Sequence, residues 1–220
     1  MSISDLLKFG KRPDAAAPGA EGEAPAATGA DPVVASKALP KFISALSHHE
    51  SPVLIDFGPV IGTNVAYFGE HLGCKLVIED IAAEVERHTR AGTRDTLAQA
   101  LSARFAQADG SVDGVLCWDI FDFLEPAAAR ALAQQVVRVL RPGGAVMGFF
   151  CTKGVDRAAF TKFEIVEATQ SLRHRPYAGA GGAKLVLQNR DIIKMFDGLV
   201  VSESFLLKSN TREILLRKRA

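Results

Sequence analysis

The sequence predicts an α/β fold with a doubly wound, mostly parallel sheet and a C-terminal antiparallel hairpin. From residue 53 to residue 150, short apolar runs alternate with segments of helical periodicity, which is typical of a parallel sheet with crossover helices. Near the C-terminus, two apolar runs are separated only by a few residues around Ser209-Asn210, so they must pair antiparallel. The length of 220 residues allows one domain plus a tail.

Strands are expected where apolar runs end at charged residues, glycine or proline. These strands are Val53–Phe57, Cys74–Ile78, Val112–Asp119, Ala145–Phe150, Leu199–Leu207 and Arg212–Arg217. Helices are expected where apolar residues recur three or four positions apart, and Pro126 stands at a first helical turn, where its missing N–H does no harm. The expected helices are Leu39–Leu46, Thr63–Leu72, Ala82–Arg90, Arg94–Phe105, Pro126–Leu140 and Asp191–Phe196. Arg141–Gly144 is expected to be a turn.

The chain divides into a tail, residues 1–36, and one domain, residues 37–220. Alanine, proline and glycine fill sixteen of the twenty-three positions from Pro13 to Ala35, a composition that predicts disorder. Ahead of this stretch, Ile3, Leu6, Leu7 and Phe9 form an apolar cluster beside basic residues. This cluster is either a docking peptide for a protein partner or a membrane surface, or a frayed terminus.

Composition excludes several functional classes. The chain has 26 Lys and Arg against 25 Asp and Glu, so nucleic acid is not indicated as a partner. No stretch has 18 uninterrupted apolar residues and no secretion signal is evident, so we expect no transmembrane segment and a cytoplasmic location. The three cysteines are far apart and form no C-x-x-C pair, which favours buried thiols over a disulfide or a metal site.

Three loops follow the carboxyl ends of predicted parallel strands, where ligands bind in such sheets. They are Asp56–Gly62, Glu79-Asp80 and Trp118–Asp122. The first leads into a helix whose leading N–H groups suit a carboxylate or a phosphate, and the acid in the second suits a ribose diol. Val60 stands where a dinucleotide site has its middle glycine, which disfavours pyrophosphate. A nucleoside with a free carboxylate fits the loop better.

These residues resemble those of class I S-adenosylmethionine-dependent methyltransferases, a Rossmann-like family, over most of Val53–Arg219. Asp56–Gly62 is similar to the family's D-x-G-x-G-x-G loop, with a degenerate middle position. Leu76–Ile81 is similar to its second strand and ribose-binding acid, and Val112–Leu116 to its fourth strand. Arg138–Gly144 is similar to the turn before its fifth strand, and the C-terminal hairpin also matches the family.

The resemblance implies S-adenosylmethionine as cofactor. It implies that Asp56 lies near the donor's amino group and that Gly58 and Gly62 flank its methionine portion. Asp80 aligns best with the ribose-binding acid, and Glu79 is the adjacent alternative.

The resemblance also places Trp118 beside the donor and Asp119 beside the methyl acceptor. Asp119, with Asp122 behind it, is the candidate to orient or deprotonate an acceptor that the sequence does not identify. Asp109 is only a weak match to the family's adenine contact. The family's third strand is hard to find, and this feature together with Val60 supports an alternative function, a non-catalytic methyltransferase-like scaffold that binds a protein partner.

Residues 155–188 are predicted to be an insertion over the acceptor site. Phe160–Glu167 has strand character, and the glycine-rich run Ala178–Ala183 is expected to be a mobile lid or a plain hairpin loop. The insertion and its surroundings carry a basic group, Arg173, His174, Arg175 and Arg190. This group either recognises an acidic acceptor or a nucleic-acid backbone, or forms a solvated basic face.

Overall fold

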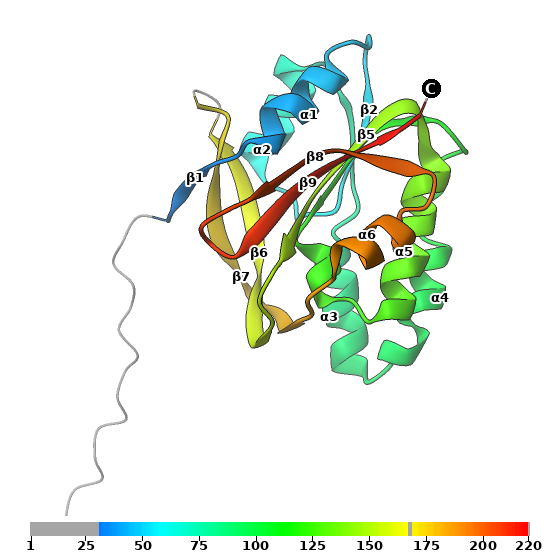
Figure 1. The fold of residues 1–220 in the computed structure, drawn as a ribbon, viewed down its shortest axis with the longest axis vertical. Helices are drawn as coiled ribbons and strands as arrows, with labels where there is room; N and C mark the ends of the chain where they lie inside the picture. Colours follow the sequence, from blue (N-terminus) through cyan, green and yellow to red (C-terminus); the bar gives the residue numbers. More distant parts are fainter. Residues whose placement is uncertain (1–30, 167–168, 220) are drawn as a thin grey trace, which may run out of the picture. The chain divides into compact units, whose positions relative to one another are not determined.

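The protein is described by a computed structural model for residues 31–166 and 169–219. Its main sheet contains β2 (Val53–Asp56), β3 (Lys75–Ile78), β4 (Val112–Trp118), β5 (Leu140–Cys151), β8 (Leu199–Leu206) and β9 (Thr211–Lys218). The strand order is β3-β2-β4-β5-β9-β8 (Figure 1). β3, β2, β4 and β5 are parallel, whereas β9 pairs antiparallel with β5 and with β8. The predicted α/β fold with its C-terminal antiparallel hairpin is confirmed.

The helices agree closely with the sequence prediction. They are α1 (Ala38–Leu46), α2 (Gly62–Ala66), α3 (Ile81–Ala91), α4 (Leu97–Ser102), α5 (Pro126–Val139) and α6 (Asn189–Met195). Three shorter helical turns are η1 (Tyr67–His71), η2 (Arg94–Thr96) and η3 (Ile120–Phe123). None of the helices in the described part of the chain is both long enough and apolar enough to cross a membrane. The predicted turn at residues 141–144 lies within the bounds of β5.

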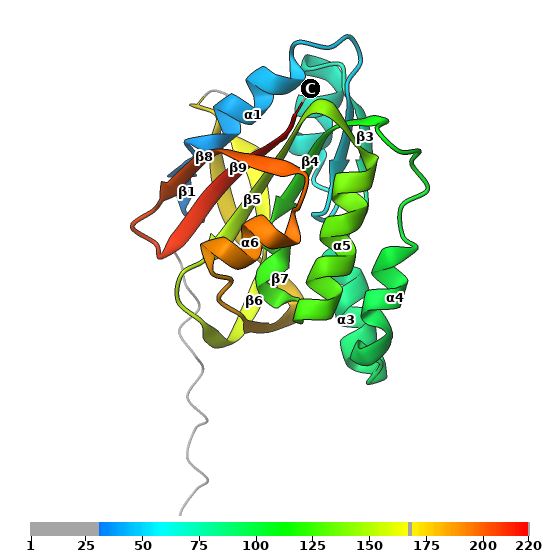
Figure 2. The same ribbon diagram turned by 45° about the vertical axis from the view of Figure 1, so that its right-hand side comes forward.

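The two faces of the main sheet are covered by different elements, as Figure 2 shows from the side. Leu54 and Leu116 point to one face and pack with α1 and η1, while their neighbours Ile55 and Val115 point to the other face and pack with α3, α4, α5 and α6. Alternation along each strand thus builds two separate cores. β3 is the edge strand, and residues 94–111 contribute η2 and α4 but no strand beside it. Residues 94–111 thus form no strand, which explains why the family's third strand is hard to find in the sequence.

A second, smaller sheet shares no strand pairing with the main one. It has the order β1-β7-β6, with β1 (Val33–Ala35), β6 (Val155–Val166) and β7 (Ser171–Lys184), all antiparallel. β1 belongs to the segment predicted to be tail, so the domain begins before residue 37. Residues 1–30, including the N-terminal apolar cluster, lie outside the described residues.

The glycine-rich run Ala178–Ala183 is not the loop that the sequence predicts, because β7 continues through it to Lys184. Pairing with β6 supplies the backbone hydrogen bonds that a loop would leave open, and Ala158 and Ala159 pair with Gly182 and Gly181. A Cβ on Gly181 would lie 2.2 Å from the carbonyl oxygen of Ala158. Glycine is therefore required here by the close approach of the two strands.

The start of α1 is held by a carboxylate from the far end of the chain. Glu213 on β9 is 1% exposed, and its Oε2 accepts hydrogen bonds from the backbone N–H groups of Lys37 and Ala38 at 2.8 and 2.9 Å. These N–H groups have no partner within the helix, and the negative charge is favourable at a helix N-terminus. Glu213 thereby anchors α1 to the antiparallel half of the sheet.

We expect Glu213→Ala to lower the free energy of unfolding by about 2 kcal/mol, because it leaves the buried Ala38 N–H and the partly buried Lys37 N–H unpaired. Urea denaturation measures this loss. Glu203→Ala is the control, since Glu203 pairs with the exposed Lys41, and we expect a change below about 0.5 kcal/mol. Equal losses in the two variants would show that the α1 anchor is not a specific contribution to stability.

Candidate functional site

The three predicted loops meet at one edge of the main sheet. Glu79 donates its backbone N–H to the Asp56 carbonyl at 2.8 Å, and Phe57 donates to the Leu116 carbonyl at 3.0 Å, so β3, β2 and β4 end side by side. The loop with Asp56 and Gly58, the acids after β3 and the residues after β4 are thus brought to the same place. This placement follows from parallel pairing, in which carboxyl ends share one edge.

Asp56, at the end of β2, is almost fully buried at 2% exposure. Its Oδ1 accepts two hydrogen bonds, from the Gly58 backbone N–H at 2.8 Å and from the Trp118 indole N–H at 2.5 Å. Burial raises the pKa of Asp56 from 3.8 to about 6, although both hydrogen bonds act to lower it. Neither donor is charged, so the desolvated carboxylate is only partly compensated.

Trp118 occupies the space above Asp56 and Gly58. A Cβ on Gly58 would lie 3.0 Å from the indole nitrogen, so the indole covers the glycine loop. The indole stacks on Phe163 of β6, with ring centroids 5.0 Å apart and an interplanar angle of 7°, and also on Phe149 of β5 at 6.3 Å. Trp118 has a left-handed backbone with φ of 49°, a strained conformation for a bulky residue.

The rest of the glycine loop is open. Val60 is 72% exposed, so its branched side chain points to solvent and does not fill the loop. A Cβ on Gly62 would meet no atom within 4 Å. Two positions further on, Asn64 of α2 donates to the Phe163 carbonyl and accepts from the Ile165 N–H, both at 2.8 Å, and so binds the edge of β6.

The two acids after β3 have different partners. Asp80 is the N-cap of α3, with φ of 31°, and its Oδ1 accepts from the Ala83 N–H at 3.1 Å. Its Oδ2 accepts from the Tyr177 hydroxyl of β7 at 3.2 Å. Glu79 follows the strand directly, and its Oε2 pairs with Arg104 Nε at 2.8 Å. Both acids lie at the carboxyl edge, one engaged by the small sheet and the other by an arginine.

Asp119 lies at the end of β4 and is 3% exposed. Its Oδ2 accepts from Lys184 Nζ at 2.8 Å and from the Thr161 hydroxyl at 3.1 Å. Its Oδ1 is buried and has no hydrogen-bond partner among the residues that the structure describes. A buried acceptor without a donor is rare and indicates a place where a group from outside the chain is expected.

Asp122 has a structural partner. Its carboxylate accepts from the Cys151 backbone N–H at 3.0 Å and lies 3.7 Å from Lys184 Nζ. Burial raises the pKa of Asp122 to about 7, against the lowering effect of Lys184. Burial opposes the charge of Lys184, but Asp119 and Asp122 outweigh this effect and raise its pKa. Lys184 therefore balances two buried carboxyl groups.

The predicted basic group does not form one surface. Arg173 and Arg175 both pair with Glu164 on β6, at 3.1 and 3.3 Å, and Arg175 also pairs with Asp31 at 2.6 Å. Arg190 lies on α6, away from these residues in the sequence, and pairs with Asp191 at 3.7 Å. Among the described residues, no group of His, Cys, Asp or Glu side chains is arranged to hold a metal ion.

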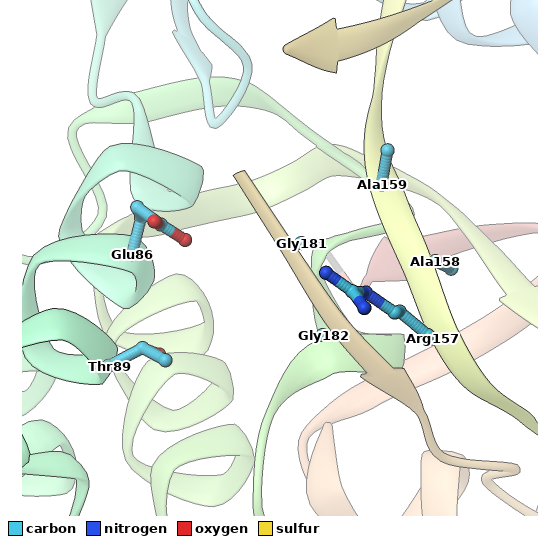
Figure 3. Close-up of a pocket in the computed structure, with 7 residues that line it drawn as sticks. All are labelled: Glu86, Thr89, Arg157, Ala158, Ala159, Gly181 and Gly182. Atoms are coloured by element: carbon cyan, nitrogen blue, oxygen red, sulfur yellow. The ribbon is translucent and has the colours of Figure 1, made fainter. Parts of the chain in front are cut away.

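A cleft of about 450 Å³ lies beside this edge, between α3 and the small sheet (Figure 3). Glu86 and Thr89 line it on the helix side, and Arg157 with Gly181 and Gly182 line it on the strand side. Its lining does not include Gly58, Asp80 or Asp119. The space between those three positions is bridged instead by side chains of the small sheet.

Sequence reasoning missed Arg104, Tyr177, Lys184 and Phe163 as members of this edge. Arg104 is distant in the sequence from its partner Glu79, and the other three reach the site only through the pairing of β6 with β7. The one available signal was the length of the insertion after β5.

The raised pKa of Asp56 predicts how stability depends on pH. Between pH 4 and pH 6 the folded protein binds more protons at Asp56 than the unfolded chain does, so stability falls as pH rises through this window. Asp56→Asn keeps an oxygen acceptor for both N–H groups but does not titrate. We expect it to remove a loss on the order of 2–3 kcal/mol between pH 4 and pH 7 in denaturation curves. Asp191→Asn, at an exposed position, is the control, and an unchanged slope in Asp56→Asn would refute this account.

No curated protein matches the chain by sequence. Among solved structures, a 1,6-didemethyltoxoflavin-N1-methyltransferase of Burkholderia thailandensis, solved with S-adenosylhomocysteine, has 14% identity and a TM-score of 0.48, over 84% of this chain and 79% of that one. The CcbJ methyltransferase of Streptomyces caelestis has 14% identity and a TM-score of 0.47, over 82% and 93%.

The sequence itself matches a family model over residues 54–144, and that model is described as a methyltransferase domain. The matched residues run from β2 to Gly144 in β5 and include the glycine loop, both acids after β3 and Asp119. Residues 54–144, which carry the three loops of the candidate site, are therefore similar to a methyltransferase domain.

Proposed function

We propose that this protein binds S-adenosylmethionine and transfers its methyl group to an acceptor that is not identified. The observation that carries the proposal is Asp56: a buried carboxylate, compensated only by two neutral N–H groups, at the carboxyl edge of a methyltransferase domain. Perturbed, desolvated acids gather at functional sites. A ligand with a cationic amino group would supply the charge that Asp56 lacks.

The acids after β3 support the same ligand. Glu79 and Asp80 lie on the strand next to Asp56, and a carboxylate can accept from both hydroxyls of a ribose. Asp80 is already the cap of α3, while Glu79 is bound by Arg104. Both acids follow the neighbouring strand β3, and the experiment below tests which of them binds the ribose.

The arrangement in the structure does not by itself fit the donor. The chemistry of the acids suits it, but the Trp118 indole holds Asp56 and covers Gly58. A donor therefore requires the indole to leave Asp56. When bound, the donor would supply an electrophilic methyl group on a sulfonium.

Asp119 is the proposed acceptor-side residue. Its unpartnered Oδ1 can accept a hydrogen bond from the nucleophilic group of an acceptor, or take its proton where the nucleophile is protonated. Lys184 and Thr161 hold the other oxygen and so fix the direction of the carboxylate. Holding an acceptor in line is expected to contribute most of the rate acceleration in this class of reaction.

A second candidate function is a non-catalytic scaffold. It is favoured by the parallel stack of Trp118 on Phe163, which resembles core packing more than an open site. On this alternative, Asp56 and Trp118 serve stability and the domain acts through protein contacts. The N-terminal segment proposed for such contacts, residues 1–12, lies outside the described residues.

Donor binding decides between the two functions. We expect S-adenosylmethionine and S-adenosylhomocysteine to bind the full chain in isothermal titration calorimetry. The affinity for S-adenosylmethionine should fall about tenfold or more in Asp56→Asn, because the charge-assisted hydrogen bond between the ligand's amino group and the carboxylate is lost. Asp191→Asn is the exposed control. No heat with either ligand at millimolar concentration would contradict the methyltransferase proposal and leave the scaffold.

The ribose-binding acid is assigned by two conservative variants. Asp80→Asn retains an N-cap, so it tests the charge without removing the cap of α3. Glu79→Gln removes the partner of Arg104 and the charge together. We expect the variant at the true ribose acid to lose about tenfold in donor affinity and the other to change less than about twofold. Equal affinity in both variants and the parent chain would exclude both acids as ribose ligands.

A further inference from the structure

We infer that the paired strands β6 (Val155–Val166) and β7 (Ser171–Lys184), called the hairpin below, are an internal plug of the donor site, which has to leave the carboxyl edge of the main sheet before a donor can bind. This inference rests on the proposed function and names a regulation of that same site. It follows from the contacts that the hairpin makes, from the unfavourable features of the closed arrangement, and from the separation of the two sheets.

The hairpin reaches the candidate positions on all three strands. Phe163 of β6 stacks on Trp118 and so holds the indole against Asp56. Tyr177 of β7 donates its hydroxyl to Asp80. These two contacts bring the hairpin to the positions expected to hold the amino group and the ribose.

The third contact lies at the end of β4. Lys184 and Thr161, one from each strand of the hairpin, donate to the same oxygen of Asp119. The Lys184 ammonium is also 5.0 Å from the centre of the Phe123 ring, a distance suited to a cation–π contact. A cationic group of the chain itself thus lies at the acceptor side, where a cationic donor is expected nearby.

With the hairpin on the carboxyl edge, several residues of the site have an energetically unfavourable backbone or environment. Trp118 and Asp80 have left-handed backbones, with φ of 49° and 31°. Asp119 Oδ1 is buried without a partner, and Asp56 is desolvated beside neutral donors. Strain of this kind persists at switching and ligand-binding sites, and replacement of the plug by a ligand would relieve part of it.

The hairpin is held against the main sheet mainly by side chains, with Phe160 and Phe163 packed into the two cores. It pairs with β1 in its own sheet and shares no strand pairing with the main sheet. Asn64 of α2 binds the edge of β6 through one side chain, and the other contacts at the site are also made by side chains. Breaking side-chain contacts does not disrupt the ladder of either sheet.

The test follows the only tryptophan of the chain, Trp118, by its fluorescence during titration with S-adenosylhomocysteine. Phe163→Leu removes the stacking ring and keeps an apolar side chain. Because the apparent affinity of a site rises with the population of its open form, we expect about two- to tenfold tighter binding and a change in Trp118 emission on binding. Phe196→Leu loses a comparable buried ring contact, with Phe121, but none of the hairpin's contacts with Trp118, Asp80 or Asp119, and should leave the affinity unchanged.

Tyr177→Phe provides a second variant if Phe163→Leu does not fold. It removes only the hydroxyl that donates to Asp80, and we expect binding about twofold tighter or more. Equal or weaker binding in these variants than in the parent chain would overturn the plug while leaving donor binding intact. Absence of binding in the parent chain and in both variants would instead overturn the proposed function, and the plug with it.

Discussion

The hydrogen bond from the Trp118 indole to Asp56 is the interaction on which the rest of the site depends. It joins the ends of β2 and β4, and it holds the indole across the glycine loop. Phe163 stacks on the indole, and this contact brings the β6–β7 hairpin to the edge of the sheet. Asp56 therefore organises both the fold at this edge and the closure of the site.

The carboxyl edge carries several acidic side chains, and basic side chains of the chain pair with only some of them. Glu79 is paired with Arg104, and Asp119 and Asp122 share Lys184, but Asp56 has neutral partners. Desolvating an acid without a cation opposes stability, which is why the pKa of Asp56 is raised. Asp56 is buried without a cation, whereas the buried acids Asp119 and Asp122 have Lys184, and this difference is the physical reason for placing the donor's cationic group beside Asp56.

The main sheet could be predicted from the sequence because each of its strands is a local apolar run, and parallel order places all their carboxyl ends together. For the same reason, the sequence located Asp56, Glu79, Asp80 and Asp119 at one edge. Their roles toward a ligand stay predictions. The hairpin could not be predicted in the same way, because its glycine-rich half has little strand propensity and becomes β7 only through pairing with β6.

A crystal structure of the chain with S-adenosylhomocysteine is the most direct measurement of the central claim. The account predicts the ligand's amino group within hydrogen-bond distance of Asp56, with the Trp118 indole displaced and the β6–β7 hairpin moved from Asp80. A ligand bound elsewhere, with the indole N–H still donating to Asp56, would contradict it.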